Sequence, residues 1–342
     1  MEQSVGSVVL SDGVTVATAT AGTGPPLLFI GGWLSRLELS WSLREERSFL
    51  EALAQGRTLV RYDRLGCGLS DRSPELSVWS MEREQETIHA VMAALGEDDF
   101  DLIGSSLGAS IAIEWAAKHP ATVKRLVLYG GWANGVDIVA PDMREHLVGL
   151  VRSHWGLGSE VLTEIFAPDA SAAMRTSLAE YQRHASSAET AAALLAACYA
   201  VDVLASLEDI TAPTLVIHRE HDRAAPSEQS RLIASRIADA RLVQLQGRSH
   251  LPYVGDVDSL ISEIRRFLGL KALRKSATPT LTKRQKEVAD LVSKGLTNRE
   301  IAERMGIDER SAEGHVERIR IRLGVRSRAQ ISAWWVGSNI HK

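Results

Sequence analysis

Ser106 lies in the pattern Gly104-x-Ser106-x-Gly108, and its surroundings suggest a reactive hydroxyl. Residues 100–103 form a short apolar run typical of a buried strand, and residues 109–118 have the apolar spacing of a helix. A serine on a sharp strand-to-helix turn stands clear of the sheet, and small residues two positions away on each side prevent clashes. Because Gly-x-Ser-x-Gly alone is a weak pattern, the flanking strand and helix are what indicate a nucleophile.

A serine nucleophile needs a base and an acid that orients the base, and both residue types follow Ser106. Asp222 and His250 each come soon after a short apolar run, at residues 214–218 and 241–245. The carboxyl ends of parallel strands meet at the edge of the sheet where ligands bind. One Asp or His in a loop is usually a solvated side chain. Three such residues in the order Ser, Asp, His, each at a strand end, predict a catalytic triad.

A backbone site for an oxyanion is predicted beside the nucleophile. The apolar run 27–30 ends in Gly31-Gly32-Trp33, so this loop can approach a reacting carbonyl group. We expect the N–H groups of Trp33 and Leu107 to donate to the oxyanion. A plain glycine turn is the alternative, and the glycine-rich segment 63–70 is interpreted as scaffold.

The C-terminal part of the chain carries a different chemistry. Thr297 caps a predicted helix, and a turn at Gly306 leads to a longer, basic helix at residues 309–323. Two short helices joined by a tight turn fit the major groove of double-stranded DNA. A helical protein–protein module with solvated charges remains the alternative. The residues predicted to contact DNA are Thr297, Asn298, Arg310, Ser311, Glu313, Gly314, His315 and Arg318.

Short apolar runs alternate with helical segments up to about residue 269, which predicts an α/β fold with a parallel sheet covered on both faces. Residues 8–10 and 14–18 add a hairpin. The predicted buried strands are 27–30, 58–62, 100–103, 125–129, 214–218 and 241–245, and the predicted helices are 81–95, 109–118, 228–237 and 259–268.

The chain is expected to contain two domains. Residues 1–269 form the α/β domain, and its interval 132–207 has helical periodicity only, which is typical of a lid over a ligand pocket. Residues 270–280 are basic and contain proline, as expected of a linker. Residues 281–342 form a small all-α domain with helices predicted at 282–294, 298–304, 309–323 and 327–336.

Composition and charge agree with two domains of different purpose. Of the 342 residues, 45% are hydrophobic and 24% are charged, which excludes disorder as the main state. The net charge of −4 combines +6 on residues 275–342 with −10 on the rest, so the basic end is a candidate for binding a polyanion. Simple drift of surface charge along the chain is the alternative.

The chain is expected to be cytoplasmic, without a membrane partner. Its longest apolar stretch, 191–201, is too short to cross a bilayer, and its first residues lack the pattern of a secretory signal. The two cysteines, Cys67 and Cys198, suit a reducing compartment and are interpreted as packing residues. No cofactor and no metal site are predicted.

Residues 8–269 resemble the α/β-hydrolase superfamily through Gly31-Gly32-Trp33, segment 63–70, the Ser106 turn, Asp222 and His250. The resemblance implies the α/β-hydrolase fold with a helical lid, a triad, and hydrolysis of an ester, lactone or amide through an acyl-enzyme. Many members carry His-Gly where this chain has Gly31-Gly32, and that histidine helps to fix the oxyanion loop. The superfamily also contains receptors that keep the triad and use the pocket for sensing.

Residues 279–336 resemble the LuxR-type helix-turn-helix domain. The resemblance implies four helices, residues 309–323 as the recognition helix, and a homodimer formed through the last helix, where Ala333-Trp334-Trp335 supplies apolar surface. Ala312 and Glu313 depart from the frequent Val and Lys, and Glu can accept a hydrogen bond from a cytosine amine. The matching positions are Leu281, Thr282, Arg284, Gln285, Glu287, Val288, Gly295, Thr297, Asn298, Glu300, Ile301, Ala302, His315, Val316, Ile319, Leu323, Gly324, Val325, Arg328 and Ala329.

Two functions follow from these patterns. The first is a DNA-binding transcriptional regulator whose α/β domain senses, and slowly hydrolyses, a small and largely apolar ester, lactone or amide. The second is an active serine hydrolase of the esterase or lactonase type with an accessory DNA-binding head. The fusion motivates the first, because a stand-alone hydrolase has no use for a recognition helix, and the complete triad pattern motivates the second.

Overall fold

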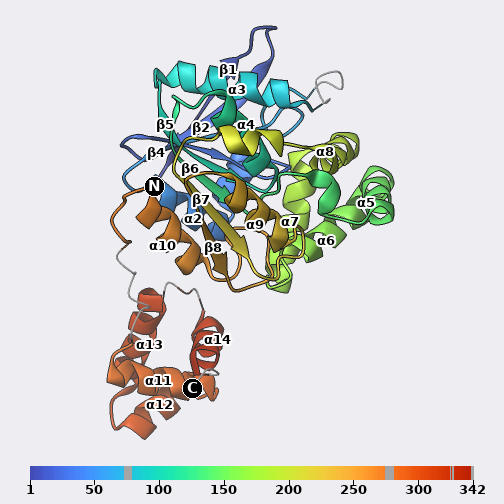
Figure 1. The fold of residues 1–342 in the computed structure, drawn as a ribbon. Helices are drawn as coiled ribbons and strands as arrows, with labels where there is room; N and C mark the ends of the chain where they lie inside the picture. Colours follow the sequence, from blue (N-terminus) through green and yellow to red (C-terminus); the bar gives the residue numbers. More distant parts are fainter. Residues whose placement is uncertain (73–78, 274–280, 324, 326, 340–342) are drawn as a thin grey trace. The chain divides into compact units, whose positions relative to one another are not determined.

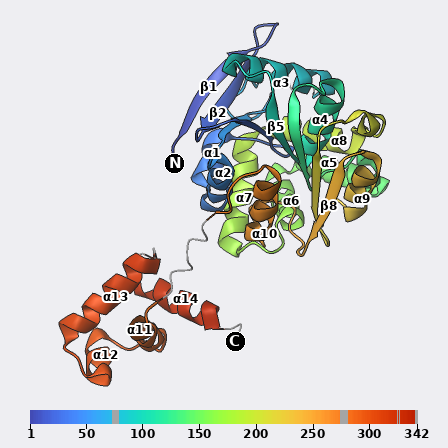
Figure 2. The same ribbon diagram turned by 60° about the vertical axis from the view of Figure 1, so that its left-hand side comes forward.

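The computed structural model describes residues 1–72, 79–273, 281–323, 325 and 327–339. The chain forms two compact units, Met1–Ala272 and Leu273–Lys342, each with its own apolar core (Figures 1 and 2). Most of the predicted linker, residues 274–280, lies outside the described residues, as does Gly324 of the LuxR-type pattern.

An eight-stranded sheet forms the centre of the first unit, in the order β1-β2-β4-β3-β5-β6-β7-β8. β1 pairs antiparallel with β2, and β2 with β4, whereas the other neighbours are parallel. The predicted parallel strands are confirmed to within two residues at each end. The strands are β1 Gln3–Val9, β2 Thr15–Ala21, β3 Pro26–Ile30, β4 Thr58–Tyr62, β5 Phe100–Ser105, β6 Val123–Tyr129, β7 Thr214–Arg219 and β8 Ala240–Leu245.

Helices cover this sheet, which explains why strands such as β5 are buried along their whole length. α2 and α10 pack against each other, α3 contacts α4, and α9 lies against β7 and β8. The sequence analysis missed α1 and α2, because the polar start of α2 obscures its apolar stripe of Phe49, Leu50 and Leu53. These helices are α1 Leu37–Ser42, α2 Arg44–Ala54, α3 Met81–Leu95, α4 Leu107–Lys118, α9 Ser227–Arg236 and α10 Val257–Phe267.

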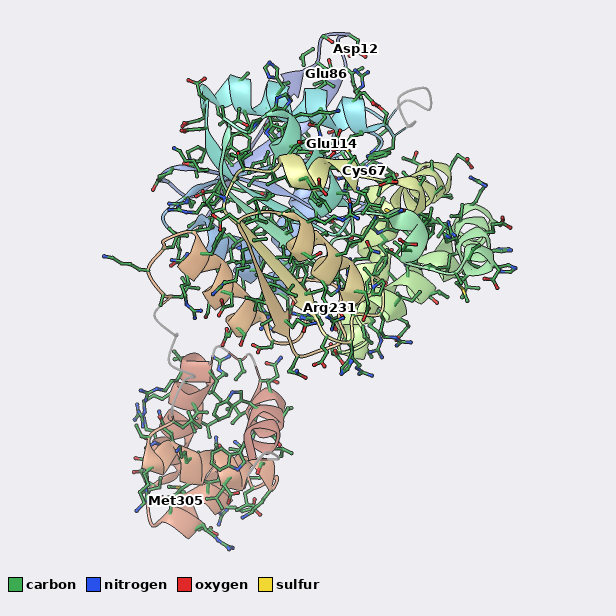
Figure 3. All side chains as sticks on the ribbon, viewed as in Figure 1. Asp12, Cys67, Glu86, Glu114, Arg231 and Met305 are labelled. Atoms are coloured by element: carbon green, nitrogen blue, oxygen red, sulfur yellow. The ribbon has the colours of Figure 1, made fainter. Side chains whose placement is uncertain are left out.

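The β1–β2 hairpin is attached to the rest of the unit at its tip. The Ser11 hydroxyl donates to Glu86 on α3 at 2.5 Å, and Asp12 pairs with Arg83 of the same helix. Figure 3 shows Asp12 and Glu86 together at this end of the unit. The turn between β1 and β2 is therefore held against α3.

The interval between β6 and β7 is helical, as the sequence predicts. Within residues 132–207 the described backbone forms no strand, only a single bridge between Asn134 and Asp202. No helix among the described residues is both long enough and apolar enough to cross a membrane. The elements of the interval are η2 Gly135–Asp137, α5 Pro141–Ser153, α6 Trp155–Phe166, α7 Ala172–Ala185, α8 Ala188–Ala200 and η3 Ala205–Asp209.

The second unit contains the four predicted helices. Thr282 and Thr297 each accept a backbone N–H at a helix start, and Gln285 and Glu300 complete the two capping boxes. A small apolar core that includes Val288, Ile301, Ala312, Ile319 and Ile331 holds the helices together. The helices are α11 Lys283–Ser293, α12 Asn298–Met305, α13 Glu309–Leu323 and α14 Arg328–Asn339.

Candidate functional site

Ser106 connects β5 to α4 in a strained backbone conformation. Its φ of 59° is the only positive φ of a non-glycine residue in the described chain. A Cβ atom at Gly104 would clash with the backbone of Gly108 and Ala109, and one at Gly108 would clash with the carbonyl oxygens of Ile30 and Gly31. The two glycines therefore allow the turn that exposes the Ser106 hydroxyl.

The structure brings Ser106, His250 and Asp222 together. His250 Nε2 lies 2.8 Å from Ser106 Oγ, and His250 Nδ1 lies 2.7 Å from Asp222 Oδ2. With Nδ1–H donating to the carboxylate, Nε2 is the nitrogen that can take the serine proton. The three side chains come from the β5–α4 turn, the loop after β7 and the loop after β8, as their positions in the sequence predict.

Asp222 is held as a carboxylate. Its side chain is fully buried, and Oδ1 accepts the N–H groups of Ala224 at 2.8 Å and Ala225 at 3.3 Å. Burial alone would raise the pKa of Asp222, but the charge of His250 and its hydrogen bond leave that pKa below the usual value. His218, which the sequence analysis did not single out, lies 3.5 Å from the same carboxylate, and burial lowers its own pKa.

Three further hydrogen bonds hold the His250 loop. The His250 N–H donates to the carbonyl of Phe166, at the end of α6, at 2.7 Å. The buried Arg219 side chain donates to the carbonyls on either side of the histidine, Ser249 at 2.8 Å and Leu251 at 3.2 Å. Sequence reasoning missed Arg219, because a cation at a strand end suggests a solvated side chain.

The loop predicted to bind the oxyanion is held by a residue that the sequence analysis interpreted as scaffold. Arg64 donates to the carbonyls of Gly32 and Trp33, and its guanidinium pairs with buried Glu84 at 2.5 Å. A Cβ atom on Gly32 would lie 3.5 Å from that of Ser106, so the loop passes close to the predicted nucleophile. Leu107 is the first residue of α4, and its N–H therefore lies at a helix N-terminus, which favours a developing negative charge.

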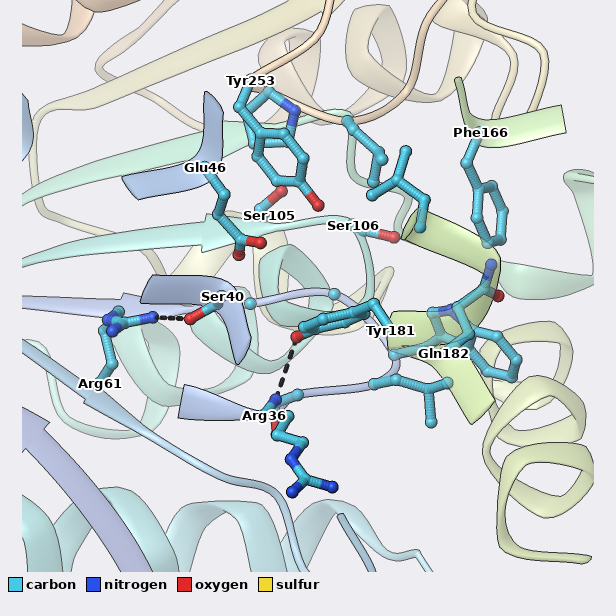
Figure 4. Close-up of a pocket in the computed structure, with 18 of the residues that line it drawn as sticks. Arg36, Ser40, Glu46, Arg61, Ser105, Ser106, Phe166, Tyr181, Gln182 and Tyr253 are labelled. Atoms are coloured by element: carbon cyan, nitrogen blue, oxygen red, sulfur yellow. Dashed lines mark hydrogen bonds between the residues drawn. The ribbon is translucent and has the colours of Figure 1, made fainter. Parts of the chain in front are cut away.

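A cavity of about 120 Å³ opens beside Ser106 and His250 (Figure 4). Phe166 from α6 forms part of its wall, with ring centroids 6.3 Å from Trp33 and 5.9 Å from His250. The described residues contain no cluster of His, Cys, Asp or Glu suited to a metal ion. The apolar lining residues are Phe29, Trp33, Leu34, Leu37, Phe166, Leu178, Leu251 and Pro252.

The residues predicted to contact DNA lie on the first turn of α12 and the first two-thirds of α13. Arg310, Glu313 and Arg318 are exposed, whereas Ser311, Gly314 and His315 are half-buried. Thr297 is exposed and caps α12. The other contacts tie these residues to their own unit: the Ser311 hydroxyl donates to Asp308 at 2.7 Å, and Asn298 Oδ1 accepts from Arg328 at 2.6 Å.

The arrangement agrees with known families. Residues 25–256 match the family described as alpha/beta hydrolase fold, and residues 279–334 match the family described as bacterial regulatory proteins, luxR family. A solved structure, that of a hydrolase from Pseudomonas aeruginosa PA01, has a TM-score of 0.67 and 25% identity over 78% of this chain and 98% of its own.

Two relatives match the first unit in sequence. Pyrrolizixenacetamide deacetylase of Xenorhabdus hominickii is 28% identical over 258 residues, which cover 72% of this chain and 92% of that protein. A 2-hydroxymuconate semialdehyde hydrolase of Pseudomonas putida is 31% identical over 230 residues, which cover 63% of this chain and 78% of that protein. The chain therefore belongs to the alpha/beta hydrolase family, and it carries a C-terminal DNA-binding domain of the luxR family of bacterial regulatory proteins.

Proposed function

We propose that this protein is a transcriptional regulator whose hydrolase domain senses, and slowly hydrolyses, a small and largely apolar ester, lactone or amide. One observation carries the proposal: a hydrogen-bonded Ser106–His250–Asp222 set on a cavity belongs to the same chain as a LuxR-type helix-turn-helix. Ligand occupancy of the cavity then changes how the head binds DNA, because a ligand that prefers one conformational state shifts the population towards it.

The cavity supports a small ligand. Its volume of about 120 Å³ is similar to that of engineered cavities that bind benzene, on the order of 150 Å³. Phe166 and Leu178 come from the helical interval 132–207, which we assign as the lid. The relatives named above as a deacetylase and a semialdehyde hydrolase support hydrolytic chemistry at this site.

In the proposed reaction, Ser106 Oγ attacks the carbonyl carbon of the ligand while His250 Nε2 takes the serine proton. The N–H groups of Trp33 and Leu107 donate to the oxyanion. The histidine then gives its proton to the departing alcohol or amine, and an acyl-serine ester remains. Water, deprotonated by His250, attacks this ester, which releases the acid and restores the serine hydroxyl.

Double-stranded DNA is the proposed partner of the second unit. Exposed Arg310 and Arg318 on α13 suit phosphate and base contacts in a major groove, and the start of α12 suits phosphate contacts. A homodimer formed through α14 would present two recognition helices to a palindromic site.

An active serine hydrolase with an accessory DNA-binding head is the second candidate. It is favoured by the triad geometry, because both hydrogen bonds of the set, at 2.8 Å and 2.7 Å, are formed. In that case turnover is fast, and cavity occupancy leaves DNA affinity unchanged.

A fluorophosphonate probe tests the nucleophile. We expect the wild type and a Ser105→Ala control to be labelled, and Ser106→Ala to remain unlabelled, as measured by intact-protein mass spectrometry. An unlabelled wild type would refute the proposed nucleophile in both candidate functions.

Covalent labelling also tests sensing. DNA sites selected from a random-sequence pool are titrated with the unlabelled protein, the labelled protein, and probe-treated Ser106→Ala. We expect labelling to change DNA affinity at least fivefold or so, which corresponds to about 1 kcal/mol of coupling, and the probe to leave Ser106→Ala unchanged. Equal DNA affinities before and after labelling would refute the proposed sensing function and would favour the second candidate, an active serine hydrolase.

A further inference from the structure

The wall of the cavity beside Ser106 also includes polar side chains that are not part of the proposed triad. Glu46 of α2, Arg61 of β4, Tyr181 of α7 and Tyr253 of the loop after β8 all line it. Figure 4 shows the Glu46 carboxyl and the Tyr181 and Tyr253 hydroxyls directed into the same space as Ser106. An entirely apolar ligand would leave any of these groups that lacks a partner in the protein without a hydrogen bond, which is costly in a buried site.

Arg61 already has its own partners in this group. Its guanidinium donates to Ser40 Oγ at 2.7 Å and to Gln3 Oε1 at 2.6 Å, and it lies 5.5 Å from the ring centroid of Trp41. No ion pair joins it to Glu46 within the described chain. Arg61 therefore contributes its charge at a distance, and Glu46 is not neutralised by direct contact.

The Tyr181 hydroxyl oxygen accepts the backbone N–H of Arg36 at 3.0 Å. Asp63, the other nearby carboxylate, accepts the N–H groups of Leu37 at 3.0 Å and Leu69 at 2.9 Å. Both oxygen groups are thus occupied by backbone donors. Neither leaves a vacant acceptor comparable to that of Glu46.

Glu46 is the exception. Although the residue is partly exposed as a whole, its Oε2 atom is buried and has no hydrogen-bond partner in the described structure. A buried acceptor without a donor costs about 1–3 kcal/mol. A carboxyl oxygen left in this state on the wall of a ligand cavity is complementary to a donor that arrives with the ligand.

We propose that Glu46 binds a hydroxyl or amino group on the part of the ligand away from the reacting carbonyl, and so selects ligands that carry such a donor. The inference rests on the proposed function, because it assumes that the cavity beside Ser106 is where the acyl ligand binds. Glu46 thereby provides a hydrogen-bond acceptor in a cavity that is also lined by apolar side chains such as Trp33, Phe166 and Leu178.

The protonation of Glu46 distinguishes the two donors. Burial raises the pKa of Glu46 to about 7, against the opposing effects of the Arg61 charge and the Tyr253 hydroxyl. The carboxyl group therefore exists in both forms near neutral pH. A ligand hydroxyl can bind either form, whereas a ligand ammonium requires the carboxylate and would pull its pKa down.

Binding to non-hydrolysing Ser106→Ala tests this inference. Three matched probes are methyl hexanoate, methyl 6-hydroxyhexanoate and methyl 6-aminohexanoate, and affinity is measured by calorimetry. We expect the hydroxyl and ammonium probes to bind about tenfold more tightly than the methyl-terminated probe. Adding Glu46→Leu should abolish both preferences, and adding Glu46→Gln should abolish only the ammonium preference. Glu45→Leu, a change in the same helical turn at a residue that does not line the cavity, is the control.

The melting temperature separates recognition from folding. Because Glu46→Leu removes a carboxyl group whose Oε2 atom is buried without a hydrogen-bond partner in the described structure, its melting temperature should equal or exceed that of the parent, and Glu46→Gln provides a milder change. Equal affinity for all three probes in Ser106→Ala, or a preference that survives Glu46→Leu, would overturn the inference while phosphonate labelling of the wild type leaves the proposed function intact. Failure of every probe to bind, together with absence of labelling, would overturn both.

Discussion

Arg219 is a fully buried guanidinium, 1% exposed, whose hydrogen bonds go to backbone carbonyls beside the proposed triad. Its charge lies 6.0 Å from the ring centroid of Tyr129, and its Nε and Nη2 atoms have no hydrogen-bond partner among the described residues. A buried cation of this kind adds little to stability. Its contribution is the position of the loop that carries His250.

Replacement of Arg219 by Met should therefore affect reactivity more than folding. We expect the rate of fluorophosphonate labelling at Ser106 to fall at least about tenfold, since small displacements of a catalytic group reduce rates strongly. The melting temperature should change by only a few degrees. Arg223→Met, at an exposed arginine of the loop after β7, is the control, and an unchanged labelling rate in Arg219→Met would contradict the positioning role.

The raised pKa of Glu46 predicts that the free energy of unfolding depends on pH. Its pKa is about 7 in the folded protein and near the ordinary 4.5 when exposed, so the folded state retains a proton that the unfolded chain releases between these values. Stability therefore falls as pH rises from about 4.5 to 7, by at most about 3 kcal/mol for this group. Arg61, Tyr181 and Tyr253 face the same carboxyl.

Urea unfolding of the wild type and Glu46→Gln at pH 5 and pH 7 measures this effect as a difference. We expect the stability of Glu46→Gln relative to the wild type to increase from pH 5 to pH 7. Glu45→Gln should show no such change. A difference that is independent of pH would mean that Glu46 does not titrate in this range.

The turn between β5 and α4 depends on the close approach of the β3–α1 loop. The backbone carbonyls of Ile30 and Gly31 lie where a Cβ atom at Gly108 would be, so the turn that carries Ser106 and the proposed oxyanion loop are packed directly together. Arg64, which pairs with Glu84, donates to the backbone of the same loop. The geometry of the site is therefore a property of two elements in contact.

Gly108→Ala should disturb both elements at once. We expect a loss of about 1–3 kcal/mol in the free energy of unfolding, because overpacking displaces backbone, and a loss of phosphonate labelling. Gly149→Ala in α5 is the matched control, since a Cβ atom there meets nothing within 4 Å. It should stabilise the protein by up to about 1 kcal/mol through helix propensity. Normal labelling of Gly108→Ala would contradict the proposed contact.

The charge of the chain is divided between its two units, with +6 on residues 275–342 and −10 on the rest. The basic share includes the exposed α13 residues Arg310 and Arg318. An acidic hydrolase domain adds no attraction for DNA. Binding should therefore depend on the phosphate contacts of the second unit alone.

The affinity of the full chain for a selected DNA site should accordingly fall steeply with salt. We expect Arg318→Ala to weaken binding at all salt concentrations and to reduce the slope of log K against log salt by about one. Arg44→Ala, at an exposed arginine of the first unit, should change neither quantity. Binding that is independent of salt would argue against phosphate contacts by α13.

The sequence by itself was sufficient for the fold class and for the group of Ser106, Asp222 and His250. Each parallel strand is a local apolar run, and the ends of such strands meet at one edge by topology, so three loop residues can be placed together without coordinates. The helices of the second unit were also predictable, because the residues that cap their starts at Thr282 and Thr297 are close to them in the sequence.

Only the tertiary structure placed Glu46 in the cavity beside Ser106 and placed Arg64 and Arg219 against the loops that they contact. Arg64 acts on Gly32 and Arg219 acts on the His250 loop, each about thirty residues away, and Glu46 shares its cavity with residues more than a hundred positions later. In sequence a charged side chain suggests solvent exposure, and α2, which carries Glu46, has a polar start that concealed the helix. Burial and partners of a charged group are set by chain segments that meet only on folding, and no local pattern records them.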